Sequence, residues 1–187
     1  QAEVNFLRSQ VNPHFLFNAL NNLYALTIKK SDEAPDVVLK LSELMEYMLY
    51  ESDEAYVPLE KEINYLKNYL ELERIRHGNN ADIQLTVTGN MDSCMIPPFL
   101  ILPLVENAFK HGISKSVHNA FLHIRIDAGK ELEVRITNNK LNFQQPDHSG
   151  GIGLFNLRRR LELLYPDKHE LKIIEKPDRY EVVLKID

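Results

Sequence analysis

The spacing of apolar residues predicts three helices in the first 78 residues of the chain. Apolar side chains recur every three or four positions, which is the period of an amphipathic helix. The positions expected to face a core are Val4, Leu7, Val11, Leu16, Leu20, Leu23 and Ile28, then Val38, Leu41, Met45 and Met48, and then Leu59, Ile63, Leu66 and Leu70. The apolar faces of these helices are narrow, and two or three such helices cannot bury them against one another alone. We therefore expect a bundle completed by a second copy of the chain.

Turn-forming residues mark where these helices begin and end. Residues 31–35 predict a turn, and Asp36 is expected to cap the second helix. Pro58 is typical of the first turn of a helix, and Gly78 is typical of the end of one.

Beyond Gly78 the apolar period changes from that of helices to a mixture of strands and helices. Strands are predicted over residues 83–87, 121–127, 132–137, 171–174 and 180–186, and helices over 98–110 and 151–165. Turns are expected at Gly129 and around Pro177 and Asp178. The fold class is therefore α+β, with a helical region at 1–78 followed by an α/β sandwich at 79–187.

Composition and charge narrow the function without changing this picture. The 187 residues are 44% hydrophobic and 26% charged, as in a folded protein. A formal net charge of -5 argues against nucleic acid as a partner, and the basic run 158–160 is expected to be a solvated helix face. The single cysteine, Cys94, fits a reducing compartment.

No apolar run is long enough to cross a bilayer. The sequence begins inside a helical pattern, so we expect a piece of a longer protein on the cytoplasmic side of a membrane. Any membrane anchor would lie in the missing N-terminal region.

His14 is the first candidate for chemistry, because it stands on the polar edge of the apolar run QVNPHFLFN. Pro13 removes a backbone donor and is expected to kink the helix, which exposes the imidazole. A neutral imidazole is a nucleophile toward phosphorus when a partner fixes its tautomer, and Asn18 lies one helical turn away. A half-buried packing histidine beside Phe15 and Phe17 is the competing interpretation.

The helix around residues 106–111 carries a second group of polar side chains. Asn107 disfavours a helix interior unless it has a partner, and its amide oxygen can ligate Mg²⁺. Glu106 can act as a base, while Lys110 and His111 can contact phosphate. An amphipathic helix with a polar edge explains the same residues equally well.

Gly151 and Gly153, followed by Leu154, precede a predicted helix. Glycines let the backbone approach phosphate, and the free N–H groups of a helix start bind anions. A glycine pair is usually only a turn, but together with Asn107 and His14 it indicates phosphoryl transfer from ATP to the histidine.

Three strings in order resemble sensor histidine kinases of the LytS/YehU type, whose catalytic half belongs to the GHKL ATPases. QVNPHFLFNALNNL resembles the phosphoacceptor motif, PLVENAFKHG the N box, and GIGLFNLRRRLELLYP the second glycine box with its helix. The resemblance covers essentially the whole chain. It implies a dimerising helical hairpin followed by a Bergerat-type sandwich.

The resemblance also implies residue roles and partners. His14 would be the phosphoacceptor, Asn107 the Mg²⁺ ligand, and Lys110 and His111 phosphate contacts. Gly151 and Gly153 would form part of the hinge of the ATP lid. The partners would be a second copy in a homodimer and the receiver aspartate of a response regulator, with ATP and Mg²⁺ as cofactors.

The chain departs from the family pattern at three positions. Phe15 stands where many kinases place an acid after the phosphoacceptor, which leaves Glu106 as the candidate base, and Pro103 replaces an N-box polar residue. Asn138 stands where the family aspartate accepts a bond from the adenine amino group. An amide lacks the charge assistance of a carboxylate, so we predict weak ATP binding, on the order of tens to hundreds of micromolar.

Two other functions compete with the autokinase. One is a kinase-like module without turnover that dimerises and binds a regulator. The other is a GHKL ATPase, which would leave the Pro13–His14 helix without a purpose. In the autokinase, the acceptor and the ATP site lie on different domains, so a hinge is expected near residues 76–80.

Overall fold

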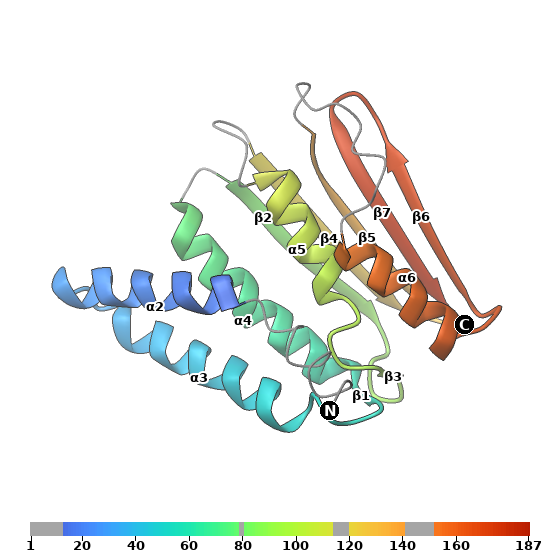
Figure 1. Cartoon of the computed structure of the whole chain (residues 1–187), viewed down its shortest axis with the longest axis horizontal. Coiled ribbons are helices and arrows are strands. Elements are labelled where there is room, and N and C mark those ends of the chain that lie inside the picture. Colours follow the sequence, from blue (N-terminus) through green and yellow to red (C-terminus); the bar gives the residue numbers. More distant parts are fainter. Residues whose placement is uncertain (1–12, 79–80, 114–119, 141–151) are drawn as a thin grey trace. The chain divides into compact units, whose positions relative to one another are not determined.

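The structure is a computed structural model that describes residues 13–78, 81–113, 120–140 and 152–187 (Figure 1). The described residues form two compact units. One unit contains the described chain up to Gly78 together with Met95–Phe99, and the other contains the described parts of 79–94 and 100–187. The chain therefore passes between the units three times.

The first unit contains three helices, α2 (Pro13–Ile28), α3 (Ala34–Tyr50) and α4 (Leu59–His77). In α4 the predicted core residues Leu59, Ile63, Leu66 and Leu70 are all buried, at 2% exposure or less. A two-stranded antiparallel sheet joins β1 (Val57–Pro58) to β3 (Met95–Ile96). The short strands tie a distant segment of the chain to the start of α4.

Two expectations about α3 were wrong. Asp36 does not cap the helix but lies in its first turn, because Glu33 takes the N-cap position and Pro35 occupies the first turn. The buried face is also rotated from the predicted one: Val37, Leu44 and Tyr47 are buried with Leu41, whereas Val38 and Met45 are 45% and 43% exposed. Tyr47 sets this rotation, because its hydroxyl bonds to the buried Glu62 of α4.

The second unit contains a five-stranded sheet with the order β2-β4-β5-β7-β6. Its strands are β2 (Ala81–Gly89), β4 (Ala120–Ala128), β5 (Leu132–Asn139), β6 (His169–Glu175) and β7 (Arg179–Ile186). β2 pairs with β4 in parallel, and the other neighbours are antiparallel. All five predicted strands are confirmed, including the hairpin around residues 177–178.

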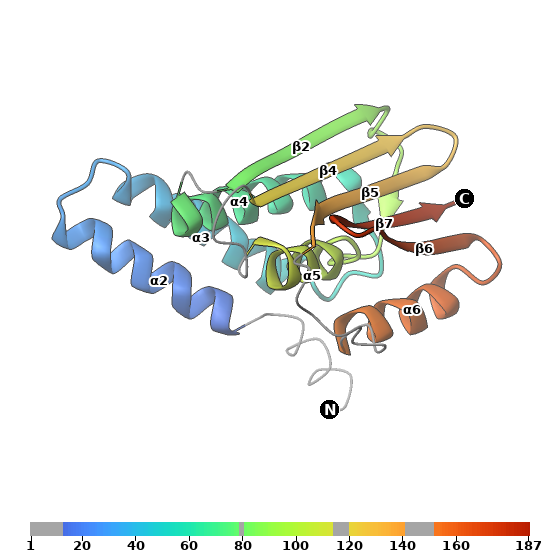
Figure 2. The ribbon, with the colours of Figure 1, turned by 90° about the horizontal axis from the view of Figure 1, so that it is seen from above.

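The helices α5 (Leu102–His111) and α6 (Ile152–Leu164) lie on the same side of this sheet (Figure 2). Apolar side chains at alternate positions of β4, β5 and β7 face them and are buried. α6 contributes Leu154, Leu157 and Leu161 to this layer, each 3% exposed or less.

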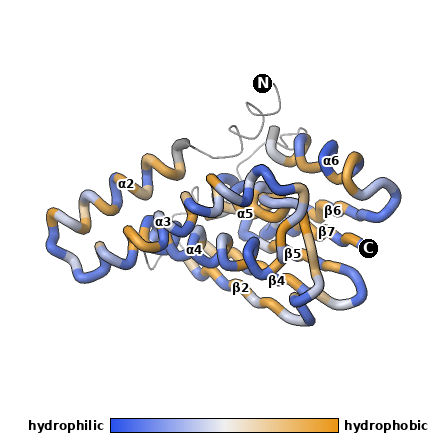
Figure 3. Tube along the Cα trace, turned by 90° about the horizontal axis from the view of Figure 1, so that it is seen from below, coloured by the Kyte–Doolittle hydropathy of each residue, from blue (hydrophilic) through white to orange (hydrophobic). Residues whose placement is uncertain are grey.

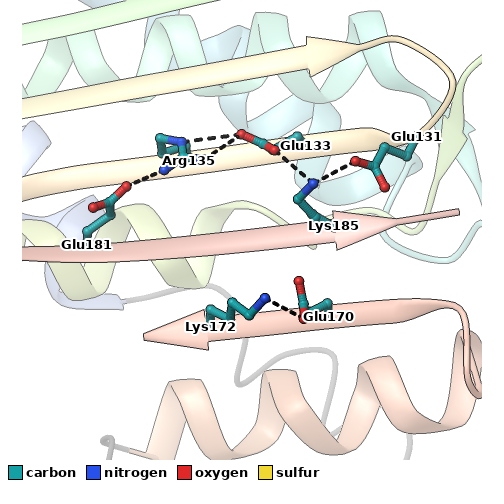
Figure 4. A network of polar contacts seen from close by, with 7 residues as sticks. All are labelled: Glu131, Glu133, Arg135, Glu170, Lys172, Glu181 and Lys185. Atoms are coloured by element: carbon teal, nitrogen blue, oxygen red, sulfur yellow. Dashed lines mark hydrogen bonds and ion pairs between the residues drawn. The ribbon is translucent and has the colours of Figure 1, made fainter. Parts of the chain in front are cut away.

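The opposite side of the sheet carries charged residues that pair across the strands (Figure 4). Arg135 on β5 bonds to Glu133 at 3.0 Å and to Glu181 on β7 at 2.5 Å. Lys185 lies 2.7 Å from Glu131 and 3.2 Å from Glu133. These cations lower the pKa of Glu133. The alternation thus separates an apolar layer under the helices from a charged outer face.

The predicted helix start at residue 98 was wrong, because α5 begins at Leu102. Pro103 sits in its first turn, where a missing N–H costs nothing, but its ring excludes a helical turn extending back to Phe99. Residues 97–99 instead follow β3, and Phe99 has a positive φ of 56°.

Candidate functional site

The buried layer of the second unit changes from apolar to polar at one end. Along its inner face β5 runs from Leu132 through Val134 and Ile136 to Asn138, and β7 runs from Ile186 through Leu184 and Val182 to Tyr180. The register places Asn138 opposite Tyr180, and Tyr180 opposite Glu175 on β6. One cross-strand row therefore gathers polar side chains where the preceding rows are apolar.

Asn138 is the most buried polar residue of this row, at 1% exposure. Its Nδ2 donates to the backbone oxygen of Asn139 at 2.9 Å, while its Oδ1 has no hydrogen-bond partner among the described residues. A Cβ added to Gly112 would come within 2.5 Å of Asn138 Nδ2, so only glycine fits at this end of α5. A buried acceptor without a partner is costly, and a ligand donor would satisfy it.

Asn107 of α5 reaches the same polar end. It is half-buried, and its side chain lies near enough to Tyr180 to influence the pKa of that phenol. The pKa of Tyr180 is raised by burial and by the carboxylate of Glu175, and Arg158 of α6 and the Asn107 amide offset only part of that rise. Three further residues lie at this polar end beside the predicted Asn107 and Asn138, and they were not predicted from the sequence: Tyr180, Arg158 and Glu175.

The other residues predicted for the nucleotide site lie on α5 and α6. Glu106 and His111 are half-buried and Lys110 is exposed. Gly153 is exposed in the first turn of α6, and Leu154 is buried at 2% exposure in the layer beneath the sheet. Gly151 lies outside the described residues, and so do the preceding residues 141–150, where the resemblance implies an ATP lid. The roles of these residues stay predictions.

The predicted phosphoacceptor belongs to the first unit. The backbone of His14 lies in α2, and its side chain lies outside the described part of the structure. The adjacent Phe15 is buried and stacks on Tyr69 of α4, with ring centroids 4.5 Å apart. Phe15 therefore anchors α2 beside the acceptor position. Asn18, one turn further on, is half-buried. The kink expected at Pro13 stays a prediction, because α2 begins there and the preceding residues are not described.

The first unit also contains a buried carboxylate that the sequence reasoning missed. Glu62 is fully buried, and its Oε2 accepts from the Tyr47 hydroxyl at 2.5 Å and from the Phe99 N–H at 3.0 Å. The Phe99 ring meets Tyr47 and Tyr65 edge-on, at centroid distances of 5.3 and 5.4 Å. Burial and the Glu62 charge raise the pKa of Tyr47 well above its usual value, so its hydroxyl stays protonated and donates.

Comparisons with known proteins point to one family. A family model described as Histidine kinase matches residues 2–81. Sensor histidine kinase BtsS of Escherichia coli K12 is 31% identical over 181 residues, covering 96% of this chain and 32% of that protein. The sensor protein LytS of Oceanobacillus iheyensis is 31% identical over 188 residues, covering 92% of this chain and 32% of that protein. The chain thus spans about a third of the length of these relatives.

A solved structure has a similar fold. The histidine kinase domain of the blue-light activated kinase EL346 from Erythrobacter litoralis matches with a TM-score of 0.52 at 16% identity, covering 93% of this chain and 95% of that one. Among the described residues, no helix has both the length and the apolar character that crossing a membrane requires.

Proposed function

The chain belongs to the LytS type of sensor histidine kinases, and on that premise we propose that it transfers the γ-phosphoryl group of ATP to His14. The phosphoryl group then passes to a receiver-domain aspartate of a response regulator. The whole protein's signal enters through regions outside this sequence.

The observation that carries this proposal is the buried Oδ1 of Asn138, which has no hydrogen-bond partner in the described part of the chain and lies at the polar end of an otherwise apolar layer. A base with an exocyclic amino group donates the missing hydrogen bond, as adenine does. Asn107, one helix away, has an amide group suited to Mg²⁺, which prefers oxygen ligands shared with phosphates. The residues of this end therefore fit a magnesium–nucleotide complex.

Bound Mg²⁺ supplies charge neutralisation at the transferring phosphoryl group. Asn107 would hold the metal through its amide oxygen, and Lys110 and His111 would contact phosphate oxygens. A ring nitrogen of His14 forms a bond to the γ-phosphorus while the bond to the bridging oxygen breaks and ADP leaves. Glu106 takes up the imidazole proton, and Asn18 orients the ring.

Self-association through the helical unit is part of the same proposal. Large apolar side chains on α2 and α3 are exposed in a single chain: Phe17, Leu20, Tyr24 and Ile28 on α2, and Val38, Leu39, Met45, Leu49 and Tyr50 on α3. Figure 3 shows hydrophobic and hydrophilic positions mixed along α2. A second copy covers such residues in a homodimer, and the hinge expected near residues 76–80 would let the two units bring His14 to the nucleotide.

A second function, a regulator-binding module without turnover, is favoured by one observation. Asn138 offers a neutral amide where the family pattern has a carboxylate, which weakens nucleotide binding. The two functions differ in whether His14 is ever phosphorylated.

Labelling with γ-³²P-ATP and Mg²⁺ separates them. The expected result is a label that is lost in acid, is stable in base, and disappears in His14→Gln. His123→Gln is the matched control, because His123 is an exposed histidine on the outer face of the sheet and should keep the label. A label that survives in His14→Gln contradicts the acceptor assignment. No label over hours, together with no nucleotide binding, supports the module instead.

A further inference from the structure

A short segment of the chain, Met95–Phe99, belongs to the first unit, although the residues on both sides of it belong to the second. Its strand β3 pairs with β1, and the N–H of Phe99 donates to the buried Glu62 at 3.0 Å. The Phe99 ring meets Tyr47 and Tyr65 edge-on. Hydrogen bonds and ring contacts therefore hold both ends of the segment on the helical unit.

One oxygen of Glu62 holds the end of this segment. The Oε2 atom accepts from the Phe99 N–H and also from the Tyr47 hydroxyl, at 2.5 Å. The side chain is fully buried, so bulk water does not replace a donor that is lost. The proposed chemistry uses none of these groups, and their role in it is therefore open to a structural explanation.

The anchored residue is followed almost at once by α5. Only Leu100 and Ile101 separate Phe99 from the first residue of the helix, Leu102. The three Cα–Cα steps from 99 to 102 span at most about 11 Å, so the start of α5 stays within that distance of Phe99 however the units move. Asn107, to which we assign the metal, lies five residues further along α5, which is about 7.5 Å of helix.

This connection limits how the second unit can move. His14 lies in one unit and the proposed nucleotide site in the other, so the units have to change their arrangement for the transfer. A long flexible linker would let the second unit shift freely, whereas a two-residue link from a fixed residue allows mainly rotation. Pro97 and Pro98 stiffen the segment before the link, because each ring fixes its φ angle.

We propose that Glu62 is a positioning residue, which holds Phe99 as the pivot about which α5 and the proposed nucleotide site rotate toward the phosphoacceptor. The proposal rests on the proposed function, because it takes His14 and the nucleotide as the groups that have to meet. The alternative is a latch, in which the segment leaves the helical unit before transfer. A pivot stays closed during transfer, and a latch opens.

A disulfide that closes β1 onto β3 distinguishes a pivot from a latch. Pro58 and Met95 are paired across these strands and are both exposed, and antiparallel partners lie within the Cα separation that a disulfide requires. Pro58→Cys with Met95→Cys is made together with Cys94→Ser, which removes the single native thiol. The oxidised protein should label His14 within about twofold of the rate of the same protein after reduction, because a pivot needs no opening. Loss of the label on oxidation, with recovery on reduction, overturns the proposal.

Tyr47→Phe loosens the anchor by removing one of the two donors to Glu62. The labelling rate at saturating ATP should fall at least about fivefold, because His14 and the nucleotide then reach the reactive geometry less often. The ATP concentration for half-maximal rate should change less than about twofold, since the second unit is untouched. Closing the disulfide in Tyr47→Phe should restore most of the rate.

Tyr56→Phe is the matched control and should keep the rate, because Tyr56 is 42% exposed in the loop before β1. An unchanged rate in Tyr47→Phe overturns the proposal, and so does a lowered rate that the disulfide does not restore. A merely structural role would lower the melting temperature without changing the rate at a temperature where both proteins are folded.

Hydrogen exchange at the Phe99 amide follows the anchor without relying on activity. This N–H should exchange as slowly as the amides inside α4, and ATP with Mg²⁺ should leave it slow. Fast exchange without nucleotide, or faster exchange when nucleotide is added, overturns the proposal. If the unaltered protein neither binds ATP nor labels His14, the proposed function fails; if it does both while the disulfide blocks labelling or Tyr47→Phe has no effect, only the pivot fails.

Discussion

A single atom, Oδ1 of Asn138, is central to the nucleotide site that we propose for the second unit. It is shielded from solvent and has no protein partner among the described residues. An amide accepts a hydrogen bond without charge, whereas a carboxylate at the same place would accept a charge-assisted bond about twice as strong. Compared with an aspartate, the asparagine is therefore expected to bind the ligand more weakly, but its burial costs less free energy when no ligand is bound.

Replacing Asn138 with aspartate should separate these two effects. Asn138→Asp is expected to tighten ATP binding about five- to tenfold, which corresponds to roughly 1 kcal/mol of charge assistance. It should also lower the melting temperature of the protein without nucleotide, because a carboxylate is then buried without a cation. Calorimetric titration and scanning calorimetry measure the two changes.

Asn139→Asp is the control for this change. Asn139 is the next residue of β5, and its Oδ1 accepts from the Phe121 N–H at 3.1 Å, which an aspartate also does. ATP affinity should stay within about twofold of the unaltered protein. An equal gain in both variants would show that added negative charge, and not the bond to the base, is responsible.

Only some of the residues at the candidate site could be predicted from the sequence. Asn107 was predicted because asparagine disfavours a helix interior unless it has a partner, and Asn138 because of its position in the pattern of the kinase family. Tyr180 was missed because tyrosine is ordinary in a strand, and nothing local shows that β7 pairs with β5 in the register that brings it to Asn138. Which residues lie side by side in this row is decided by the pairing of the strands.

The two short strands β1 and β3 position a residue that the helices of the first unit need. They bring Phe99 to the α3–α4 pair, where its N–H bonds to a carboxylate 37 residues earlier in the chain. The bond compensates the positive φ of Phe99, which costs about 1 kcal/mol or more in a residue with a side chain. Leu100 and Ile101 separate Phe99 from the start of α5 at Leu102.

Removing one hydroxyl from this arrangement should loosen it measurably. Tyr47→Phe is expected to lower the free energy of unfolding by about 1–3 kcal/mol, because a buried carboxylate loses a donor. Urea denaturation followed by circular dichroism measures the change. Tyr56→Phe, at an exposed tyrosine, should stay within about 0.5 kcal/mol. Equal stability of the two variants would show that the Tyr47–Glu62 bond contributes nothing.

The helices and the five strands of the sheet could be predicted because each has a clear apolar period of its own. The start of α5 and the buried face of α3 could not. The buried face of α3 depends on the contact of Tyr47 with Glu62, which reads in the sequence as one more charge in a helix although it is fully buried. The start of α5 depends on Pro103, whose effect on the preceding residues the apolar period does not show. Period alone favoured Val38 and Met45, and the hydrogen bond of Tyr47 favoured the neighbouring face.

For the molecule as a whole, the exposed apolar residues of α2 predict how copies associate. Ile28→Glu is expected to weaken self-association at least tenfold, because burying a side chain of this size contributes about 1.5–3 kcal/mol and a charge opposes it. Sedimentation equilibrium measures the dimer constant. Leu163→Glu is the control, since Leu163 of α6 is 74% exposed but lies outside the helical unit. Equal weakening by both variants would exclude α2 as the interface.

The threefold passage of the chain between the two units has a consequence for ancestry. Domains joined by one linker can be exchanged by recombination at that linker, each keeping its own contacts. A crossover at Gly78 would here separate Glu62 from Phe99 and β1 from β3, although both fragments look complete in sequence. A hybrid protein joined at this point would take Glu62 and β1 from one parent and Phe99 and β3 from the other. We therefore expect the two halves of this chain to have been inherited together.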